Sequence, residues 1–515
     1  MKLNQIKSGT ILSYLQIGLG AVINLLYTPV MLRILGQNEY GLYNTVSSTI
    51  SMLSILNLGF SSSYIRYYSV YKKDNDWNSV NKLNGLFLGI FLVIGSVALL
   101  CGLFLANNLE LVFADGLAAG ELILAKQLMV LLSVNLAISF PMSVFTSIIS
   151  ANERFVFLKS VGILKTVISP LLCIPLLLAG YRSLGLVVCT LVISLIVDIL
   201  NIYYVLHKLG NRFIVGIPTP GVLKDLFAYT TFIALNIIVD QVNTNLDKVL
   251  LTRYNGTASS AIYSVGFQLY QYFVMFSTAI SSVYVPKVHM CVQKTAENIT
   301  QRKEELTSLF TRVGRLQFIV LGLVSSGLLF FGKSFIMVYW AGPEYEASYY
   351  VMLMLVLPAM VPLIQNIGIE IQRAQNKHQF RSIAYMGMAI VNFLLTVALC
   401  PVYGAVGAAA GTMISLVLAN GFVMNIYYHK RCQIDILSFW RSIISLAKGL
   451  WLPVGLGIII SRMTFNMTLS QFLGAIILYS AVYTISMLLL GMDPVERNKA
   501  LDFFRLCLKG KKRKP

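Results

Sequence analysis

The sequence predicts an all-α polytopic membrane protein with about 14 transmembrane helices. Of its 515 residues, 57% are hydrophobic and only 12% are charged, and the mean hydropathy is +0.74. A soluble protein carries about 25% charged residues. Apolar runs of about 20 residues, the length that a helix needs to cross a bilayer, recur along the whole chain. A transmembrane β-barrel would instead require short segments of alternating polarity.

The predicted spans follow one another with short connections. The N-terminal segment MKLNQIKSGT leads directly into the first span without a small-residue cleavage site, so we expect a retained helix rather than a removed signal peptide. No connection reaches the roughly 50 residues of a folded domain, so any chemistry is expected within the membrane. The expected spans are 11–32, 42–65, 83–106, 122–150, 160–180, 184–206, 226–252, 257–286, 308–332, 347–372, 382–401, 404–428, 444–461 and 470–491.

The basic charge of the chain follows this topology. The formal net charge is +19, which by itself could indicate a nucleic-acid partner. With the N-terminus in the cytosol, however, 32 of the 40 lysines and arginines lie in or beside inner segments and 5 lie in outer loops. This asymmetry is typical of membrane proteins. It predicts a multi-pass protein with both termini cytoplasmic and no nucleic-acid partner, and a basic tail, KGKKRKP, that suits anionic lipid headgroups.

An internal repeat of about 220 residues divides the first twelve spans into two copies of six. The motif NIYY occurs at 201–204 and again at 425–428. Because six is an even number, both copies are expected to insert in the same orientation, as parallel repeats. When the two copies are placed in register, Arg33 aligns with Arg253, Gly36 with Gly256, and Tyr43 with Tyr263.

The repeat predicts the domain organisation. Residues 1–208 are expected to form an N-lobe of spans 1–6, and residues 226–430 a C-lobe of spans 7–12. Residues 209–225 contain glycine, proline and basic residues, as a cytoplasmic linker should. Residues 431–495 would supply the two extra C-terminal spans, and residues 496–515 a basic cytoplasmic tail.

Span 7 carries an unusual set of polar residues. An ionised carboxylate at the centre of a membrane helix costs roughly 2.5–3.5 kcal/mol. At 100° per residue, Asn236, Asp240, Asn243 and Asp247 lie within about 60° of one another. Such a stripe is expected to face protein or water rather than lipid. At the corresponding positions, the first copy has Gln16, Gly20, Ile23 and Tyr27.

Basic and amide side chains accompany this stripe. Asp240 lies in the middle of the span, which suits it to bind a coupling H⁺ or Na⁺. Purely structural roles stay open, because polar contacts between membrane helices are common although each contributes only about 0.6 kcal/mol. Lys165, Arg33 and Arg253 could also extend toward the membrane surface. The residues expected to bind substrate are Gln16, Asn24, Arg33, Arg66, Lys165, Asn236, Asn243, Asp247, Lys248 and Arg253.

The sequence does not indicate a metal site or a catalytic centre. The seven cysteines are scattered without a C-x-x-C pair, and the four histidines lie near span ends without metal-ligand spacing. We therefore expect no metal, no catalytic residue and no cofactor beyond the coupling ion.

Several motifs resemble a known family. The segments SYLQIGLGAVINLLYTPVMLRILGQNEYGLYN (13–44), LSILNLGFSSSYIRYYSVYK (53–72), ANERF (151–155) and NTNLDKVLL (243–251) are similar to those of polysaccharide transporters. This family includes O-antigen and other lipid-linked oligosaccharide flippases. It belongs to the multidrug/oligosaccharidyl-lipid/polysaccharide exporter superfamily. The resemblance covers essentially the whole chain, and its most specific element is the pattern R-x-L-G-x-x-x-Y-G-x-Y from Arg33 to Tyr43.

The resemblance implies a V-shaped two-lobe bundle in the bacterial plasma (inner) membrane. It further implies that undecaprenyl-pyrophosphate-linked oligosaccharide moves from the inner to the outer leaflet by alternating access. The product would be a cell-surface polysaccharide such as O-antigen or an exopolysaccharide, with a polymerase and glycosyltransferases as partners besides membrane lipids. The basic residues agree with this substrate, because arginine and lysine bind pyrophosphate.

Two other interpretations stay open. An ion-coupled multidrug exporter of the same superfamily would favour an acidic cavity for cationic drugs, whereas the basic residues here favour an anionic substrate. A membrane glycan polymerase is expected to have a large outer loop or an acidic metal-binding motif, and the sequence shows neither. We therefore predict a transporter rather than an enzyme.

Overall fold

A computed structural model describes residues 5–114, 116–218, 222–295, 298–377 and 379–508. Within these ranges the regular elements are all helical. Nine helical segments of the part searched are long and apolar enough to cross a membrane. The chain is therefore an all-α polytopic membrane protein. These segments are Ser8–Lys73, Trp77–Asn107, Ala119–Ala151, Phe155–Lys208, Ile299–Trp340, Pro343–Ile364, Gln379–Lys430, Ile436–Ser461 and Leu469–Gly491.

Helices contain most of each of the fourteen predicted spans, and four pairs of adjacent spans share one segment. Spans 1 and 2 lie in Ser8–Lys73, spans 5 and 6 in Phe155–Lys208, and spans 11 and 12 in Gln379–Lys430. Spans 7 and 8 share helix α8, Val222–Ser282. In each pair a residue with a non-helical backbone separates the two spans, namely Gly36, Gly180, Gly256 and Gly404.

The backbone at these breaks confirms the predicted repeat. Gly36 has φ 74° and ψ 174°, and its counterpart in the second copy, Gly256, has φ 81° and ψ 176°. Only glycine adopts this region readily, which explains why both copies have glycine here. Arg182 (φ 47°, ψ −138°) and Gly404 (φ 54°, ψ −136°) form a second pair. The arginine stays in this unfavourable conformation beside Glu39, whose carboxylate lies 2.8 Å from Arg182 Nε.

Two tight turns also recur in both copies. Glu153 has φ 56°, and Asn376, which follows the equivalent helix of the second copy, has φ 55°. In both turns the next N–H donates to a carbonyl five residues earlier, at 3.1 and 2.8 Å. Gly210 and Gln433, which are separated by the same interval as Glu153 and Asn376, have φ 65° and 59°. The repeat therefore extends from the first span of each copy to the end of its sixth.

Internal contacts divide the chain into two compact units. Unit 1 comprises Met1–Val265 and Tyr385–Thr412, and unit 2 comprises Gly266–Ala384 and Met413–Pro515. The lobes predicted at 1–208 and 226–430, and their V-shaped arrangement, stay predictions. The predicted basic tail, 496–515, begins in helix α18 (Pro494–Leu508), and its residues 509–515 lie outside the described part.

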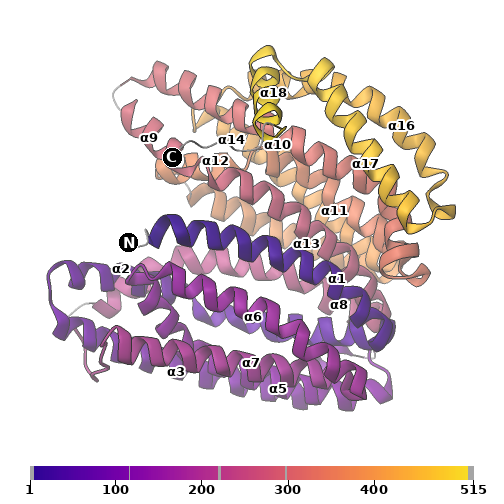
Figure 1. Cartoon of the computed structure of the whole chain (residues 1–515). Helices are drawn as coiled ribbons and strands as arrows, with labels where there is room; N and C mark the ends of the chain where they lie inside the picture. The colour runs from indigo at the N-terminus through magenta and orange to yellow at the C-terminus, as the bar shows by residue number, and fades with distance from the viewer. Residues whose placement is uncertain (1–4, 115, 219–221, 296–297, 378, 509–515) are drawn as a thin grey trace. The chain divides into compact units, whose positions relative to one another are not determined.

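Unit 1 is built on close helix packing. Helices α3 (Trp77–Asn107) and α5 (Ala119–Ala151) lie side by side (Figure 1). A Cβ atom on Gly95 would lie 2.5 Å from Ala137 O, and one on Gly102 would lie 2.0 Å from Ser133 Oγ. Small residues on one face of α3 thus let the two backbones approach, as is usual between membrane helices. Unit 1 also contains α2 (Phe60–Lys73), α6 (Phe155–Leu176) and α7 (Arg182–Tyr203).

Unit 1 also joins α1 (Gln5–Met52) to α8. A Cβ atom on Gly41 would lie 1.9 Å from Thr257 O, so the two backbones touch just after the Gly36 and Gly256 breaks. One turn further on, Thr45 Oγ1 lies 2.6 Å from the hydroxyl oxygens of both Thr252 and Ser260. These contacts fix the outer part of α8 against the first copy.

Unit 2 is organised around α10 (Ile299–Ser334), which packs on α11 (Glu346–Ile364), α15 (Ile436–Leu446) and α16 (Trp451–Ser461). Arg315 of α10 is buried, with its guanidinium 2.7 Å from Glu496 and 3.2 Å from Asp493. It also donates to Ser442 O at 2.7 Å. One side chain therefore ties α15 and the start of α18 to α10. Unit 2 also contains α9 (Val285–Lys294), α12 (Ile367–Ala374), α14 (Met424–Lys430) and α17 (Leu469–Ser486).

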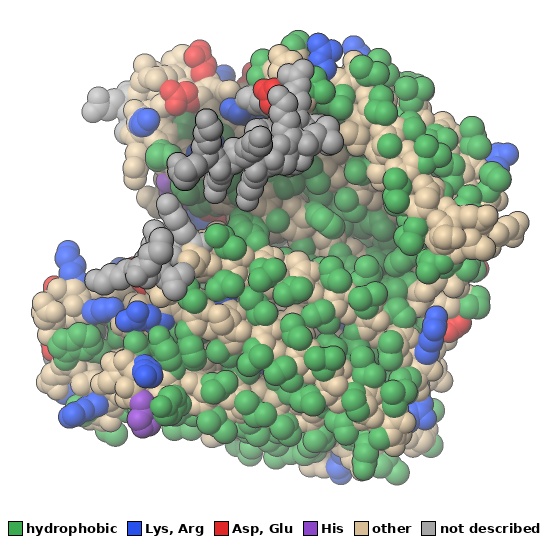
Figure 2. Space-filling model, viewed as in Figure 1, with side chains coloured by type: hydrophobic (Ala, Val, Ile, Leu, Met, Phe, Trp, Pro, Cys, Tyr) green, Lys and Arg blue, Asp and Glu red, His purple; other side chains and the backbone are tan. Residues whose placement is uncertain are grey.

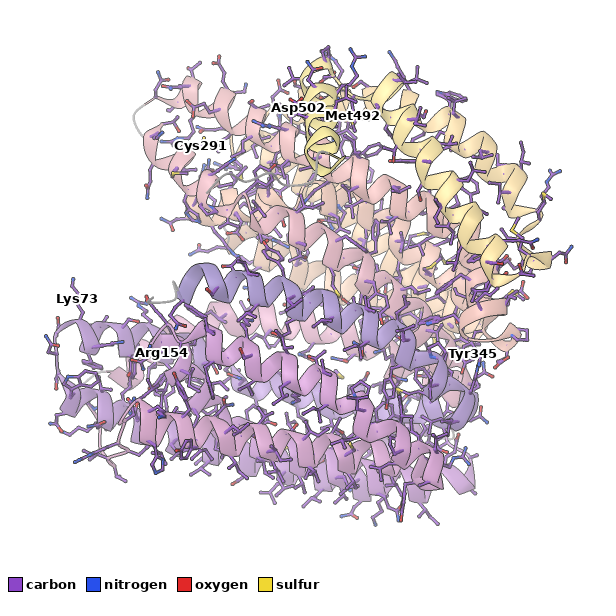
Figure 3. The ribbon with its side chains drawn as sticks, viewed as in Figure 1. Lys73, Arg154, Cys291, Tyr345, Met492 and Asp502 are labelled. Atoms are coloured by element: carbon purple, nitrogen blue, oxygen red, sulfur yellow. The ribbon has the colours of Figure 1, made fainter. Side chains whose placement is uncertain are left out.

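The ends of the helices agree with the predicted alternation of the loops. Lys73 and Arg154, both predicted to be cytoplasmic, lie at the same end of unit 1 (Figure 3). In unit 2, Tyr345, predicted to be outside, lies at the opposite end from Met492 and Asp502 (Figure 3). Hydrophobic side chains cover much of the visible face of α3, α6 and α7, with lysines and arginines at its ends (Figure 2). Which end is cytoplasmic stays a prediction from charge.

Candidate functional site

Asp247 lies within a cluster of hydroxyl groups inside unit 1. It is 1% exposed. Tyr263 Oη donates to Asp247 Oδ2 at 2.5 Å, Thr412 Oγ1 to the same oxygen at 3.0 Å, and Thr396 Oγ1 to Oδ1 at 3.2 Å. A buried carboxyl group requires hydrogen-bond partners. The three donors therefore offset part of the cost of burying this carboxylate.

Two broken helices bring these donors together. Tyr263 follows Asp247 by 16 residues, which would separate them by about 24 Å along a straight helix. Their hydrogen bond forms because α8 breaks between them at Gly256. Helix α13 (Gln379–Leu416) breaks in the same manner between Thr396 and Thr412. Asp247 thus lies where the arms of two helical hairpins meet.

The cluster extends to two further predicted residues. Thr412 Oγ1 lies 3.2 Å from Asn392 Oδ1, and Asn392 Nδ2 donates to Asn243 Oδ1 at 3.4 Å. Lys248 is half-buried, and its charge acts on Asp247. The structure therefore brings together three of the predicted substrate-binding residues, Asn243, Asp247 and Lys248.

The first copy has an uncharged version of the same cluster. In the aligned copies, Tyr27 corresponds to Asp247 and Tyr43 to Tyr263. Two cysteines near Tyr27, Cys173 and Cys189, are both buried. Tyr27 interacts with Tyr43 and with both of these cysteines. The two copies share the hairpin geometry, and only the second places an acid in it.

The inner part of the predicted stripe is more exposed than its outer part. Asn236 and Asp240 are exposed and Asn243 is half-buried, whereas Asp247 is buried. The polar face of α8 therefore changes along the helix from an accessible surface to a closed, hydrogen-bonded interior. The predicted ion-coupling residue, Asp240, lies on the accessible part.

Three predicted residues take part in contacts between neighbouring helices or loops of unit 1. Arg253 donates to Leu111 O at 2.8 Å, at the end of the short helix α4 (Leu109–Phe113). Lys165 donates to Ser194 Oγ of α7 at 3.1 Å. Gln16 packs against α6, where a Cβ atom on Gly162 would lie 2.5 Å from its Nε2. These contacts support at least a structural role for each residue.

The other three predicted residues are exposed. Asn24 and Arg33 lie on α1, and Arg66 lies on α2. Their positions leave the side chains accessible to a ligand, and their role in binding stays a prediction.

Sequence reasoning missed the partners of Asp247 as site residues. Tyr263 was visible as a repeat match with Tyr43, and Thr412 as a match with Thr190. Those matches were signals of shared structure, but a helical wheel describes one helix and could not place Thr396 or Asn392 beside α8.

Comparisons with known proteins agree with the helical architecture. A family profile described as "Polysaccharide biosynthesis protein" matches residues 6–291. A curated relative, the probable flippase AglR of Haloferax volcanii, is 24% identical over 230 residues, which are 44% of this chain and 45% of that protein. The matched region thus spans about half the length of this relative.

Solved structures of transporters share the fold. The lipid II flippase MurJ, in an inward closed conformation, superposes with a TM-score of 0.69 at 17% identity, covering 93% of this chain and 97% of that one. An inward-facing multidrug resistance MATE family transporter of the MOP superfamily gives 0.62 at 13% identity, covering 83% and 95%. These likenesses establish the fold. Since the family profile covers more than half of the sequence, the chain belongs to the polysaccharide biosynthesis protein family.

Proposed function

We propose that this protein is a flippase that moves undecaprenyl-pyrophosphate-linked oligosaccharide from the inner to the outer leaflet of the bacterial plasma membrane. The observation that carries the proposal is the polar face of α8, on which Asn236 and Asp240 are exposed within a predicted membrane span. Polar side chains at membrane depth must meet protein or water. An accessible polar face on a transporter fold suits a hydrophilic headgroup whose lipid tail stays in the bilayer.

The chemistry of such a headgroup divides the predicted residues into two classes. A pyrophosphate is best held by arginine and lysine, for which exposed Arg33 and Arg66 and half-buried Lys248 are candidates. Sugar hydroxyls pair with amide side chains such as Asn24 and Asn236. The chain is similar to a probable flippase, AglR, and shares its fold with the lipid II flippase MurJ, which supports transport without a catalytic step.

Transport against a gradient requires an energy source, and α8 offers two acids for a coupling cation. Asp240 is exposed, as a residue that exchanges a proton with the cavity should be. Asp247 is enclosed by three hydroxyl groups, and oxygen ligands of this kind are those that a hard cation such as Na⁺ prefers. If Asp240→Asn abolishes the dependence of flipping on a pH or Na⁺ gradient and Asp247→Asn does not, Asp240 is the coupling site. If only Asp247→Asn abolishes that dependence, Asp247 is the coupling site.

A second candidate function is an ion-coupled multidrug exporter, which the similarity to MATE transporters favours. It predicts that a cationic drug would bind near Asp240. A third, a membrane glycan polymerase, would require catalytic groups on an outer surface. Deletion of the gene distinguishes these possibilities in cells.

Under our proposal, deletion causes lipid-linked oligosaccharide to accumulate and a surface polymer, such as O-antigen or an exopolysaccharide, to disappear. Drug sensitivity stays unchanged. A polymerase defect would instead leave single repeat units on the outer leaflet. Normal surface polysaccharide together with raised drug sensitivity would overturn the proposal in favour of the exporter. Partner glycosyltransferases and a polymerase are expected to be encoded nearby.

A further inference from the structure

An apolar groove runs along α3 in unit 1. It has a volume of about 690 Å³ and is bounded by the 3₁₀ turn Leu53–Asn57, the start of α2, α3 and the linker around Val215. Its floor follows α3 from Gly85 through Gly89 to Val97. The side chains that line it are almost all apolar. The groove is independent of the Asp247 cluster and of the proposed flippase activity.

The walls of the groove expose large apolar side chains. Val93 is 65% exposed, Ile217 is 53% exposed, and Val215 is 98% exposed. Contiguous apolar patches on proteins mark interaction sites. Because α3 is one of the membrane-crossing segments, hydrocarbon is the natural occupant.

The length of the groove matches one leaflet. From Gly85 to Val97, α3 rises by about 18 Å at 1.5 Å per residue. The hydrocarbon core of a bilayer is about 30 Å thick, so the groove spans roughly half of it. The linker end of the groove is predicted to be cytoplasmic. The groove therefore faces the inner leaflet.

A lysine side chain lies at the linker end of the groove. Arg212 N donates to Asn81 Oδ1 and Ile214 N to Asn81 O, both at 3.0 Å, which fastens the linker to the start of α3. Gly216 lies against the stem of Lys82, whose Cγ would be 3.6 Å from a Cβ atom at that glycine. Asp76 interacts with Lys82. Lys82 therefore places a cationic side chain beside Gly216, at the linker end of the groove.

We propose that this groove binds one acyl chain of an anionic phospholipid of the inner leaflet, with its phosphate at Lys82 and Arg212. An apolar channel one leaflet long, with a cationic mouth at the membrane surface, is complementary to such a lipid in shape and in charge.

The glycines of the chain supply a clean test. A Cβ atom on Gly89 would meet no other atom within 4 Å, so leucine at this position fills the groove without displacing the backbone. Gly474 of α17 is equally open and lies outside the groove. Native mass spectrometry of protein extracted from phosphatidylglycerol and phosphatidylethanolamine vesicles measures retained lipid. We expect Gly89→Leu to bind phosphatidylglycerol at least tenfold more weakly than the wild type, and Gly474→Leu to match the wild type.

The headgroup is tested separately, which keeps the proposal falsifiable if Gly89→Leu folds poorly. We expect Lys82→Gln and Arg212→Gln to reduce the preference for phosphatidylglycerol over phosphatidylcholine. Lys73→Gln, an exposed lysine of α2 outside the groove, should leave that preference unchanged. Unchanged lipid retention in a well-folded Gly89→Leu protein overturns the proposal. The proposal is also overturned if the wild type binds phosphatidylglycerol and phosphatidylcholine equally, or if undecaprenyl phosphate displaces phosphatidylglycerol.

Discussion

The hydrogen bond between Tyr263 and Asp247 gives a quantitative test of the buried cluster. The two oxygens are 2.5 Å apart, and Asp247 is 1% exposed. A hydrogen bond to a charged group contributes about 1.5–3 kcal/mol in soluble proteins. Contacts between membrane helices average about 0.6 kcal/mol and reach about 1.7 kcal/mol. A short, enclosed, charge-assisted bond belongs at the upper end of the membrane range.

We therefore predict that Tyr263→Phe lowers the free energy of unfolding by about 1.5 kcal/mol. The cause can be isolated with a double-mutant cycle that includes Asp247→Asn. Asparagine keeps a carbonyl that accepts from Tyr263 but removes the charge, which accounts for about half of the strength of such a bond. The cycle should give a coupling energy of about 0.8 kcal/mol, measured by unfolding in mixed detergent micelles.

The first copy provides the matched control. Tyr43→Phe removes the equivalent hydroxyl next to Tyr27, where no carboxylate is present. A double-mutant cycle of Tyr43→Phe with Asp247→Asn should give no coupling energy. Independent sites show effects on the free energy of unfolding that add to within about 0.3 kcal/mol. If Tyr263→Phe and Asp247→Asn add to within this scatter, the reasoning that this hydroxyl holds a charged carboxylate is refuted.

Three other predictions test the packing and the ligand site. Arg315 is buried, whereas its partners Glu496 and Asp493 are 24% and 63% exposed. Arg315→Gln should therefore lower the free energy of unfolding in detergent by about 1.5–3 kcal/mol, the range for hydrogen bonds to charged groups, and expose α18 to protease. An α18 that stays protease-resistant would contradict this prediction. Gly41→Ala should lower the free energy of unfolding by about 1–3 kcal/mol, because the new Cβ would lie 1.9 Å from Thr257 O. Gly18→Ala is the control: its Cβ would meet no atom within 4 Å, so it should change the free energy of unfolding by less than about 0.5 kcal/mol. Arg33→Ala and Lys248→Ala should slow flipping while membrane insertion, measured by fractionation, stays normal; unchanged flipping would remove both from the binding site.

Much of the architecture could be predicted from the sequence, because hydropathy and glycine act locally. Apolar length alone located the spans. The pairing of Gly36 with Gly256 anticipated two breaks whose φ and ψ agree to within about 10°, since few residues other than glycine adopt that conformation. A repeat detected in sequence thus corresponds to a repeated backbone turn.

The candidate site was predicted only in part, because its partners come from elsewhere in the chain. A helical wheel assigns a direction within one helix and assumes that the whole stripe has one environment. In fact Asp240 is exposed, whereas Asp247 is buried and hydrogen-bonded by Thr396 and Thr412 of the α13 hairpin. Long-range contacts of this kind leave no periodic signal in the sequence.

The basic residues show the same limit. Charge and position within the span suggested a ligand role for Lys165 and Arg253. The structure gives both of them protein partners, Ser194 Oγ and the carbonyls of Leu111 and Val112. Such partners lie far away in the chain, so charge and position within a span could not identify them.

Direct observation of flipping tests the central claim. Purified protein is reconstituted in vesicles that contain fluorescent undecaprenyl-pyrophosphate oligosaccharide, and a membrane-impermeant reagent quenches the probe in the outer leaflet. We predict that the protein makes the probe of the inner leaflet accessible as well, and that Arg33→Ala slows this step. The account is contradicted if the inner-leaflet probe stays protected from the reagent while the same reconstituted protein transports a cationic drug.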